Sequence, residues 1–159
     1  MVHEYFLWIA TLAYGLHIVE EMVLDWRGWA RGFLKLPAEW NEFYVFNAVV
    51  ILYGCISAII GWKCPMIALS YPALMLINTV FFHLLPVLKS GRFSPGLFTA
   101  LILFVPIAAL TYYGASVDDV ISIKSIVFST VFGIIFMAYP ITLQILKTKP
   151  FFLQQNRND

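Results

Sequence analysis

The chain has 159 residues and a net charge of only +1, and 61% of its residues are apolar whereas 12% are charged. Soluble domains average roughly 45–50% apolar and about 25% charged residues, so this composition excludes an ordinary water-soluble fold. The small net charge, without a basic block or an aromatic RNA-binding motif, also excludes nucleic-acid binding. The mean hydropathy of +0.82 instead favours an integral membrane protein.

Five apolar runs account for this hydropathy, and each is close to the ~20 residues that cross the hydrocarbon core of a bilayer. They occupy residues 5–24, 43–62, 66–88, 95–114 and 120–146. In lipid the backbone of each run must satisfy its own hydrogen bonds, which requires helices. We therefore predict an all-α fold, a polytopic bundle of about five transmembrane helices forming one domain over 1–159.

The first run ends in His17-Ile18-Val19-Glu20-Glu21, which places a base and two acids at i, i+3 and i+4. Residues with these spacings lie within about 100° on one helix face, so their side chains can converge. Two adjacent carboxylates in a low-dielectric region need a cation, protons or water nearby. This group is the first candidate functional site.

The segment 25–42 separates the first and second runs and mixes indole rings with cations. Such a mixture is typical of residues at the level of the lipid headgroups. The residues concerned are Trp26, Arg27, Trp29, Arg31, Lys35 and Trp40. We predict an interfacial segment on the membrane surface, with a lid over the polar end of the bundle as the alternative.

The second run begins beside three polar residues. An acid such as Glu42 suits a helix start through the dipole alone, and it is equally a candidate ligand or general base. For Glu39 and Asn47 a structural role is the favoured explanation. Asn47 is also a candidate for orienting a ligand of a nearby site.

The third run contributes Asn78 and His83. Reckoned by depth at ~1.5 Å per residue, His83 lies level with His17. Asn78 and His83 differ by about 140° around an ideal helix, so they are not expected to share a face. Either Pro72 and Pro86 distort this helix, or Asn78 orients a ligand without binding an ion itself. We favour the second explanation.

The last two runs contain hydroxyl side chains such as Thr99, which we interpret as ordinary hydrogen-bond donors to the backbone or to neighbouring helices. Neither run carries a haem or flavin signature. We therefore expect both helices to be scaffold.

The distribution of cations predicts the orientation of the bundle. Eight of the ten lysines and arginines fall on the side of segment 25–42, and these are Arg27, Arg31, Lys35, Lys89, Arg92, Lys147, Lys149 and Arg157. By the positive-inside rule this side is cytoplasmic and the N-terminus lies outside. We expect the location to be the plasma (inner) membrane.

Histidines and acids from separate helices at one depth predict a divalent metal site. We expect the ligands to be His17, Glu20, Glu21 and His83. Nitrogen and oxygen ligands suit zinc, or iron or manganese, as a single ion or a carboxylate-bridged pair. Since a metal can acidify a bound water, Glu21 and Glu42 are the candidate catalytic residues.

With these residues in place, the sequence resembles the HXXEE-motif family of small integral membrane proteins. The family also has an Asn-to-His motif, matched here by Asn78 and His83 with one extra residue between them. Its Tyr-X-Pro-Gly motif is matched by Phe93-Ser94-Pro95-Gly96, with phenylalanine in place of tyrosine. The resemblance covers residues 17–96 and implies a membrane protein with a candidate enzymatic role, without naming a substrate.

Two functions from different classes follow. The first is a metal-dependent membrane enzyme acting on a lipid or another apolar molecule, either a hydrolase or an oxygen-activating oxidoreductase. The second is a proton- or cation-coupled transporter or ion-binding module, for which a homodimer could supply the pathway. A third hypothesis is a scaffold that only binds a partner. Membrane lipid is the expected partner in each case.

Overall fold

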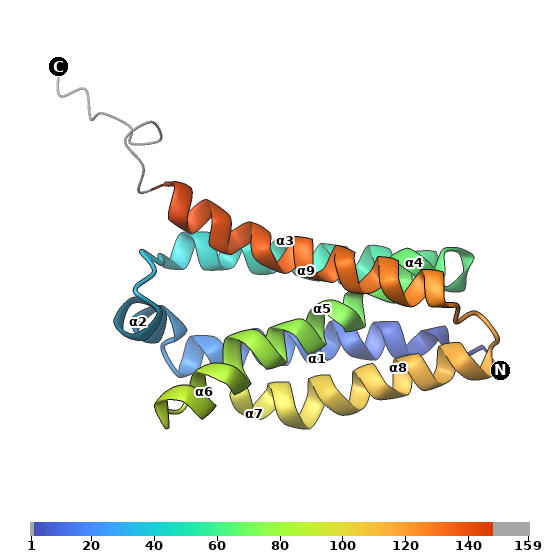
Figure 1. Ribbon diagram of the computed structural model, residues 1–159, viewed down its shortest axis with the longest axis horizontal. Coiled ribbons are helices and arrows are strands. Elements are labelled where there is room, and N and C mark those ends of the chain that lie inside the picture. The colour runs from blue at the N-terminus through green and yellow to red at the C-terminus, as the bar shows by residue number, and fades with distance from the viewer. Residues whose placement is uncertain (1, 148–159) are drawn as a thin grey trace, which may run out of the picture.

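In the computed structural model of the protein, the residues described are 2–147. Within this range, five helical stretches are long and apolar enough to cross a membrane, and they are His3–Val23, Trp40–Lys63, Pro65–Ser90, Leu97–Val117 and Ile123–Leu146. They run side by side along the long axis of the molecule (Figure 1). The predicted all-α bundle of five membrane-spanning helices is confirmed, and each bound differs from the predicted one by at most three residues.

Short π-helical and 3-10 segments interrupt these stretches. In chain order the elements are η1 (His3–Tyr5), α1 (Phe6–Val23), α2 (Trp26–Trp29), η2 (Ala30–Leu34), α3 (Trp40–Ile60), η3 (Gly61–Lys63), α4 (Pro65–Ala68), α5 (Ser70–Asn78), η4 (Thr79–Leu84), α6 (Leu85–Ser90), α7 (Leu97–Thr99), η5 (Ala100–Phe104), α8 (Val105–Val117) and α9 (Ile123–Leu146). Lys149 and Arg157, which entered the orientation argument, lie outside the described residues.

The start of α9 shows why the last apolar run and the last helix differ. The hydroxyl of Ser122 accepts from the backbone N–H of Ser125 at 3.0 Å. In return, the hydroxyl of Ser125 accepts from the backbone N–H of Ser122 at 2.8 Å. This reciprocal capping satisfies two amides that a helix start leaves unpaired. The helix therefore begins at Ile123, three residues after the apolar run begins.

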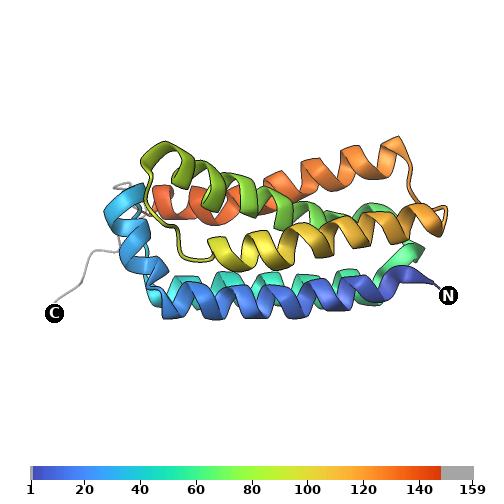
Figure 2. The ribbon, with the colours of Figure 1, turned by 90° about the horizontal axis from the view of Figure 1, so that it is seen from below.

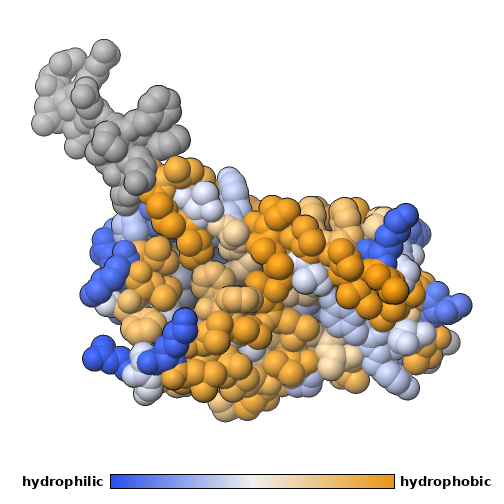
Figure 3. Space-filling view, viewed as in Figure 1, coloured by the Kyte–Doolittle hydropathy of each residue, from blue (hydrophilic) through white to orange (hydrophobic). Residues whose placement is uncertain are grey.

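The packed core is centred on α5. Tyr71, Leu74 and Met75 are fully buried and pack against the small residues of α1 and against Phe104. The outward faces are apolar as well, and an apolar band lies between two polar ends on the face seen in Figure 3. Such a surface is unfavourable in water but suits hydrocarbon.

The interfacial segment closes one end of the bundle. Figure 2 shows α2 lying across the ends of the long helices. The ring of Trp26 packs on that of Phe43 with centroids 5.3 Å apart, and Glu39 pairs with Arg27 at 2.9 Å and with Arg31 at 2.6 Å. Glu39 thus has the structural role that we expected, because it ties this segment to the start of α3.

Candidate metal centre

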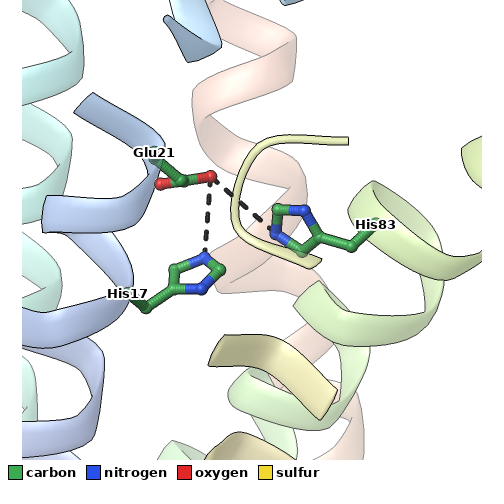
Figure 4. A group of neighbouring side chains, drawn as sticks. All are labelled: His17, Glu21 and His83. Carbon is green, nitrogen blue, oxygen red and sulfur yellow. Dashed lines mark ion pairs between the residues drawn. The ribbon is translucent and has the colours of Figure 1, made fainter. Parts of the chain in front are cut away.

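Two histidines and one acid from two membrane-spanning stretches meet at the end of the bundle that the interfacial segment closes. Nε2 of His17 lies 3.6 Å from Oε1 of Glu21, and Nε2 of His83 lies 3.8 Å from the same oxygen. The three side chains point toward one another, His17 and Glu21 from α1 and His83 from η4 (Figure 4). Both histidines are fully buried and Glu21 is 6% exposed. We call these three residues the His–Glu cluster.

The two ring nitrogens that face Glu21 lack hydrogen bonds. Neither Nε2 atom has a hydrogen-bond partner within residues 2–147, although the opposite nitrogen of each ring has one. Buried polar atoms are nearly always paired in folded proteins, so two orphaned nitrogens at one point require an explanation. Both nitrogens are directed at Oε1 of Glu21, so the three atoms could serve as ligands of one ion.

The protonation of His17 follows from its contact with Thr99. Nδ1 of His17 lies 2.9 Å from the Thr99 hydroxyl, whose own proton goes to Glu20 at 2.5 Å or to the carbonyl of Gly96 at 3.3 Å. Since both of those oxygens only accept, the Thr99 oxygen must accept from Nδ1–H of His17. Nε2 of His17 therefore carries a lone pair directed at Glu21.

The tautomer of His83 is set by the Ser94 hydroxyl, which lies close to the backbone carbonyl of Phe82. Pro86 has no N–H, so it cannot donate an α-helical hydrogen bond to the carbonyl of Phe82 four residues earlier. The Ser94 hydroxyl donates to this carbonyl at 3.2 Å, and its oxygen lies 3.1 Å from Nδ1 of His83. Because the hydroxyl proton of Ser94 is directed to a carbonyl, the Ser94 oxygen accepts from Nδ1–H of His83. Nε2 of His83 therefore also carries a lone pair.

The π-helical segment η4 changes the angle around the helix axis between Asn78 and His83. We expected about 140° between them on an ideal α-helix. In a π-helix the hydrogen bonds join residues five apart, so residues with this spacing lie nearly above one another. Of the two explanations offered by the sequence, helix distortion is therefore the one that the structure contains, and it occurs directly before Pro86.

Gly96 allows the loop before α7 to rest directly on the cluster. A Cβ at this position would lie 2.6 Å from Cε1 of both His17 and His83, and 3.0 Å from Cγ of Glu21. The residue also has a φ of +90°, which side chains other than glycine rarely adopt. Glycine is thus required both for the turn and for contact with all three cluster residues.

Glu20 and Glu21 have different surroundings. The carboxylate of Glu20 accepts from the backbone N–H groups of Phe98 at 3.2 Å and Thr99 at 2.7 Å, and from the Thr99 hydroxyl. These amides begin the fourth stretch, where a helix start favours negative charge. Glu20, which we expected to be a metal ligand, is therefore linked to His17 through Thr99, and Glu21 is the acid that faces the two histidines.

The cluster offers three ligand atoms that could hold a metal ion. Its three candidate ligand atoms all lie within 4.8 Å of one another. For bonds of about 2.0–2.1 Å in a tetrahedral site, ligand atoms are separated by about 3.4 Å, slightly less than the two distances measured here. Two imidazoles with bare nitrogens and one carboxylate are also the donor set found at zinc and non-haem iron sites.

The other predicted site residues lie outside the His–Glu cluster. Glu42 accepts from Lys147 Nζ at 2.7 Å and from Gln144 Nε2 at 2.5 Å, so it joins α3 to α9. Asn47 donates to the carbonyl of Phe43 at 3.0 Å. Asn78 is 5% exposed, and its Nδ2 lies 3.9 Å from Sδ of Met137.

A cavity adjoins the cluster on the side of Glu21, and we call it the central cavity. Its wall is formed mainly by aromatic and aliphatic side chains from α3, η4 and α9. It also includes Glu21, Asn47, Asn78 and Gln144, with Trp26 and Leu36 of the interfacial segment at one end. The structure thus brings Glu21 and both predicted asparagines to one apolar cavity.

Thr99 and Ser94 are the residues that sequence reasoning missed. We interpreted Thr99 as a scaffold hydroxyl, and the motif around Ser94 was noted only through the family resemblance. The one available signal was the position of Ser94-Pro95-Gly96 shortly before Thr99, at the start of a helix on the same side of the membrane as the first motif.

Comparisons with known proteins place the chain in a family. The chain is 30% identical over 143 residues to the "Uncharacterized protein YrkK" of Bacillus subtilis (strain 168), which covers 84% of this chain and 90% of that protein. No solved structure matches the chain. The family model described as "Protein of unknown function with HXXEE motif" matches residues 8–111, which include all three cluster residues, Glu20, Ser94, Gly96 and Thr99. The chain therefore belongs to the HXXEE family.

Proposed function

We propose that this protein is a membrane-embedded, metal-dependent enzyme that acts on a lipid-like substrate. The metal would be held by His17, Glu21 and His83. The observation that carries this proposal is the convergence of two bare imidazole nitrogens and one carboxylate, without mutual hydrogen bonds, in a buried layer. Leaving such groups without a central cation is unfavourable in a low-dielectric environment.

The position of the central cavity supports an apolar substrate. Glu21 belongs both to the cluster and to the cavity wall, so a molecule in the cavity lies beside the metal ligands. Phe43, Phe136 and Met137 give the wall an apolar character that suits a hydrocarbon chain. Trp26 at its outer end lies on the interfacial segment, so a substrate would arrive from the adjoining leaflet.

The chain's own residues would supply ligands, orientation and exclusion of water. A bound divalent ion would polarise a substrate oxygen and lower the pKa of a coordinated water. Ser94 and Thr99 fix the tautomers of the two histidines, and Phe104, whose ring centroid is 4.4 Å from that of His17, keeps water from the rings. Zinc in this site would indicate hydrolysis, and ferrous iron would indicate oxygen-dependent oxidation.

We further propose that the site end of the bundle faces the cytoplasm in the plasma membrane. Six lysines and arginines of the described residues belong to loops and helix ends on this side, namely Arg27, Arg31, Lys35, Lys89, Arg92 and Lys147. Reporter fusions at both termini test this orientation. Activity of a cytoplasm-specific reporter at the N-terminus would contradict it.

The test of the proposed function uses the full chain purified after growth with zinc or with iron. The metal-loaded protein is incubated with a lipid extract, and the lipids are followed by mass spectrometry. We expect one lipid class to be converted by wild type but not by Glu21→Gln or by chelator-treated protein. No conversion together with no stoichiometric metal would overturn the proposal. Cation flux in proteoliposomes without lipid conversion would favour a transporter.

A further inference from the structure

The central cavity contains two buried amide oxygens that its own wall does not satisfy. Asn78 is 5% exposed and Gln144 is 6% exposed, and both residues line the cavity. In the part of the chain that the structure describes, neither Oδ1 of Asn78 nor Oε1 of Gln144 has a hydrogen-bond partner. Both atoms are hydrogen-bond acceptors, so a partner must bring an N–H or an O–H.

The orientation of the Gln144 amide is fixed by its neighbour. Nε2 of Gln144 donates to Oε2 of Glu42 at 2.5 Å, and a carboxylate can only accept. The amide oxygen of Gln144 must therefore point away from Glu42. Gln144 is two residues, about 3 Å, from the end of α9, and it lines the cavity together with Trp26 and Leu36 of the interfacial segment.

Asn78 lies deeper in the bundle and closer to the cluster along its own helix. One π-helical turn separates Asn78 from His83, so both face the same side. Among the residues that the structure describes, its Nδ2 has only the weak acceptor Sδ of Met137, at 3.9 Å. An acceptor one turn from a candidate metal ligand is placed to contact the reacting part of a bound molecule.

The remaining wall excludes a small polar ligand. Phe46, Val50 and Phe136 extend the cavity along α3 and α9 toward the middle of the membrane. A chain of hydrocarbon matches this wall, whereas a sugar or a free amino acid would leave its own polar groups unpaired there. The occupant must therefore combine an apolar chain with a small number of hydrogen-bond donors.

We infer that the central cavity binds a single-chain amphiphile that carries an amide N–H or a hydroxyl, such as a fatty amide or a long-chain alcohol. Its N–H or O–H donates to Oδ1 of Asn78, and its chain lies along the aromatic wall. This inference rests on the proposed function, because it names the substrate class of the same site. It makes Asn78 the residue that distinguishes donor-bearing lipids from esters and hydrocarbons.

The test measures binding rather than turnover. Two probes of equal chain length, a brominated long-chain amide and the corresponding brominated methyl ester, are titrated into the purified, chelator-treated full chain. Bromine quenches nearby indole fluorescence, and Trp26 lines the cavity. The variant Trp26→Phe identifies the part of the signal that reports on the cavity.

We expect the amide to bind about 3- to 10-fold more tightly than the ester in wild type, the effect of a hydrogen bond to an otherwise unpaired acceptor. In Asn78→Leu this preference should disappear while the ester binds unchanged. Equal affinity of the two probes for wild type would overturn the inference, even if Asn78→Leu failed to fold. An amide preference that persists in Asn78→Leu would contradict the role of that residue.

The outcome is separable from that of the proposed function because the metal has been removed. A preference for the amide in a protein that never binds stoichiometric metal would leave the cavity assignment standing and reject the metalloenzyme. Stoichiometric metal without any preference would reject only the amphiphile.

Discussion

The two ends of the bundle use the same kinds of side chain in opposite ways. At the end of the bundle where the N-terminus lies, Asp118 accepts from the backbone N–H of His3 at 2.5 Å, from the His3 ring at 2.8 Å and from the indole of Trp62 at 2.8 Å. At the other end, Nε2 of each histidine stays 3.6–3.8 Å from Oε1 of Glu21, and neither nitrogen has a hydrogen-bond partner among the described residues.

This difference shows that the His–Glu cluster is not an ordinary ion pair. The contact between His3 and Asp118 forms at direct hydrogen-bond distance in a partly exposed position, where a mismatch would cost little. The cluster is buried, and its two Nε2 atoms direct lone pairs at a carboxylate that cannot donate to them, so the three groups lack the proton that holds His3 and Asp118 together. The following predictions test this contrast.

The largest effect is expected from loss of a histidine in the cluster. His83→Ala removes one of three candidate ligands, so bound metal should fall from about one ion per chain to near zero. Elemental analysis of the purified protein measures this change. The matched control is His3→Ala at the opposite end, which should retain the metal. Equal metal content in the two variants would contradict the contrast between the ends.

Gly96→Ala is expected to damage both folding and metal binding. The added methyl would meet Cε1 of His17 and His83 at 2.6 Å, and overpacking of this kind typically costs about 1–3 kcal/mol. The control is Gly91→Ala, which has a similar positive φ of +65° but nothing within 4 Å.

Thermal unfolding and metal titration of these two glycine variants separate backbone strain from collision. Both should lose some stability, since both residues have a positive φ. Only Gly96→Ala should bind metal more weakly. If the two variants behave alike, contact of the loop with the cluster has no energetic importance.

A smaller effect is expected from Thr99→Val, which keeps the shape of the side chain and removes the hydroxyl. His17 then loses the acceptor that holds its Nδ1–H, and loss of such a supporting hydrogen bond typically weakens metal binding about 10- to 100-fold. Thr142→Val is the control, because the exposed Thr142 hydroxyl donates to the carbonyl of Ala138 within its own helix, away from the cluster. Unchanged metal affinity in Thr99→Val would remove Thr99 from the site.

The smallest effect concerns Asp118 and depends on pH. The backbone N–H of His3, together with its ring and the indole of Trp62, lowers the pKa of Asp118 to about 2. In the unfolded chain an Asp has a pKa of about 3.9, so the ionised form stabilises the folded state above about pH 4. This contribution is lost as the pH falls from about 4 to about 2.

Unfolding of Asp118→Asn followed against pH checks this expectation. The variant should be less stable than wild type at neutral pH, and the difference should shrink below about pH 4. Asp119→Asn, which makes the same charge change at the exposed neighbouring residue, should differ little from wild type at any pH. A constant difference between Asp118→Asn and wild type across this range would be evidence against the lowered pKa.

Much of the fold and part of the site could be predicted from sequence. The five spans follow from hydropathy alone, because lipid leaves a chain few alternatives to helices. His17 and Glu21 are one helical turn apart, and counting residues from the helix ends places His83 at their depth. These relations are local or depend only on helix length, which is why they could be inferred.

The division of roles between Glu20 and Glu21 could not be predicted. The two residues are about 100° apart on α1, and only the position of the fourth stretch decides which one meets helix amides and which one meets histidines. The facing of Asn78 depends on η4, a change of hydrogen-bond register that apolar periodicity does not reveal. The part played by Ser94 requires the loop to fold back onto the carbonyl of Phe82.

X-ray absorption spectroscopy at the edge of the bound metal tests the central claim most directly. For the full chain, a metal held by His17, Glu21 and His83 predicts a spectrum with two imidazoles and one carboxylate at about 2.0–2.2 Å. The His17→Ala/His83→Ala double variant should show no metal. A spectrum without imidazole scattering, or metal that remains in the double variant, would contradict a metal centre in the His–Glu cluster.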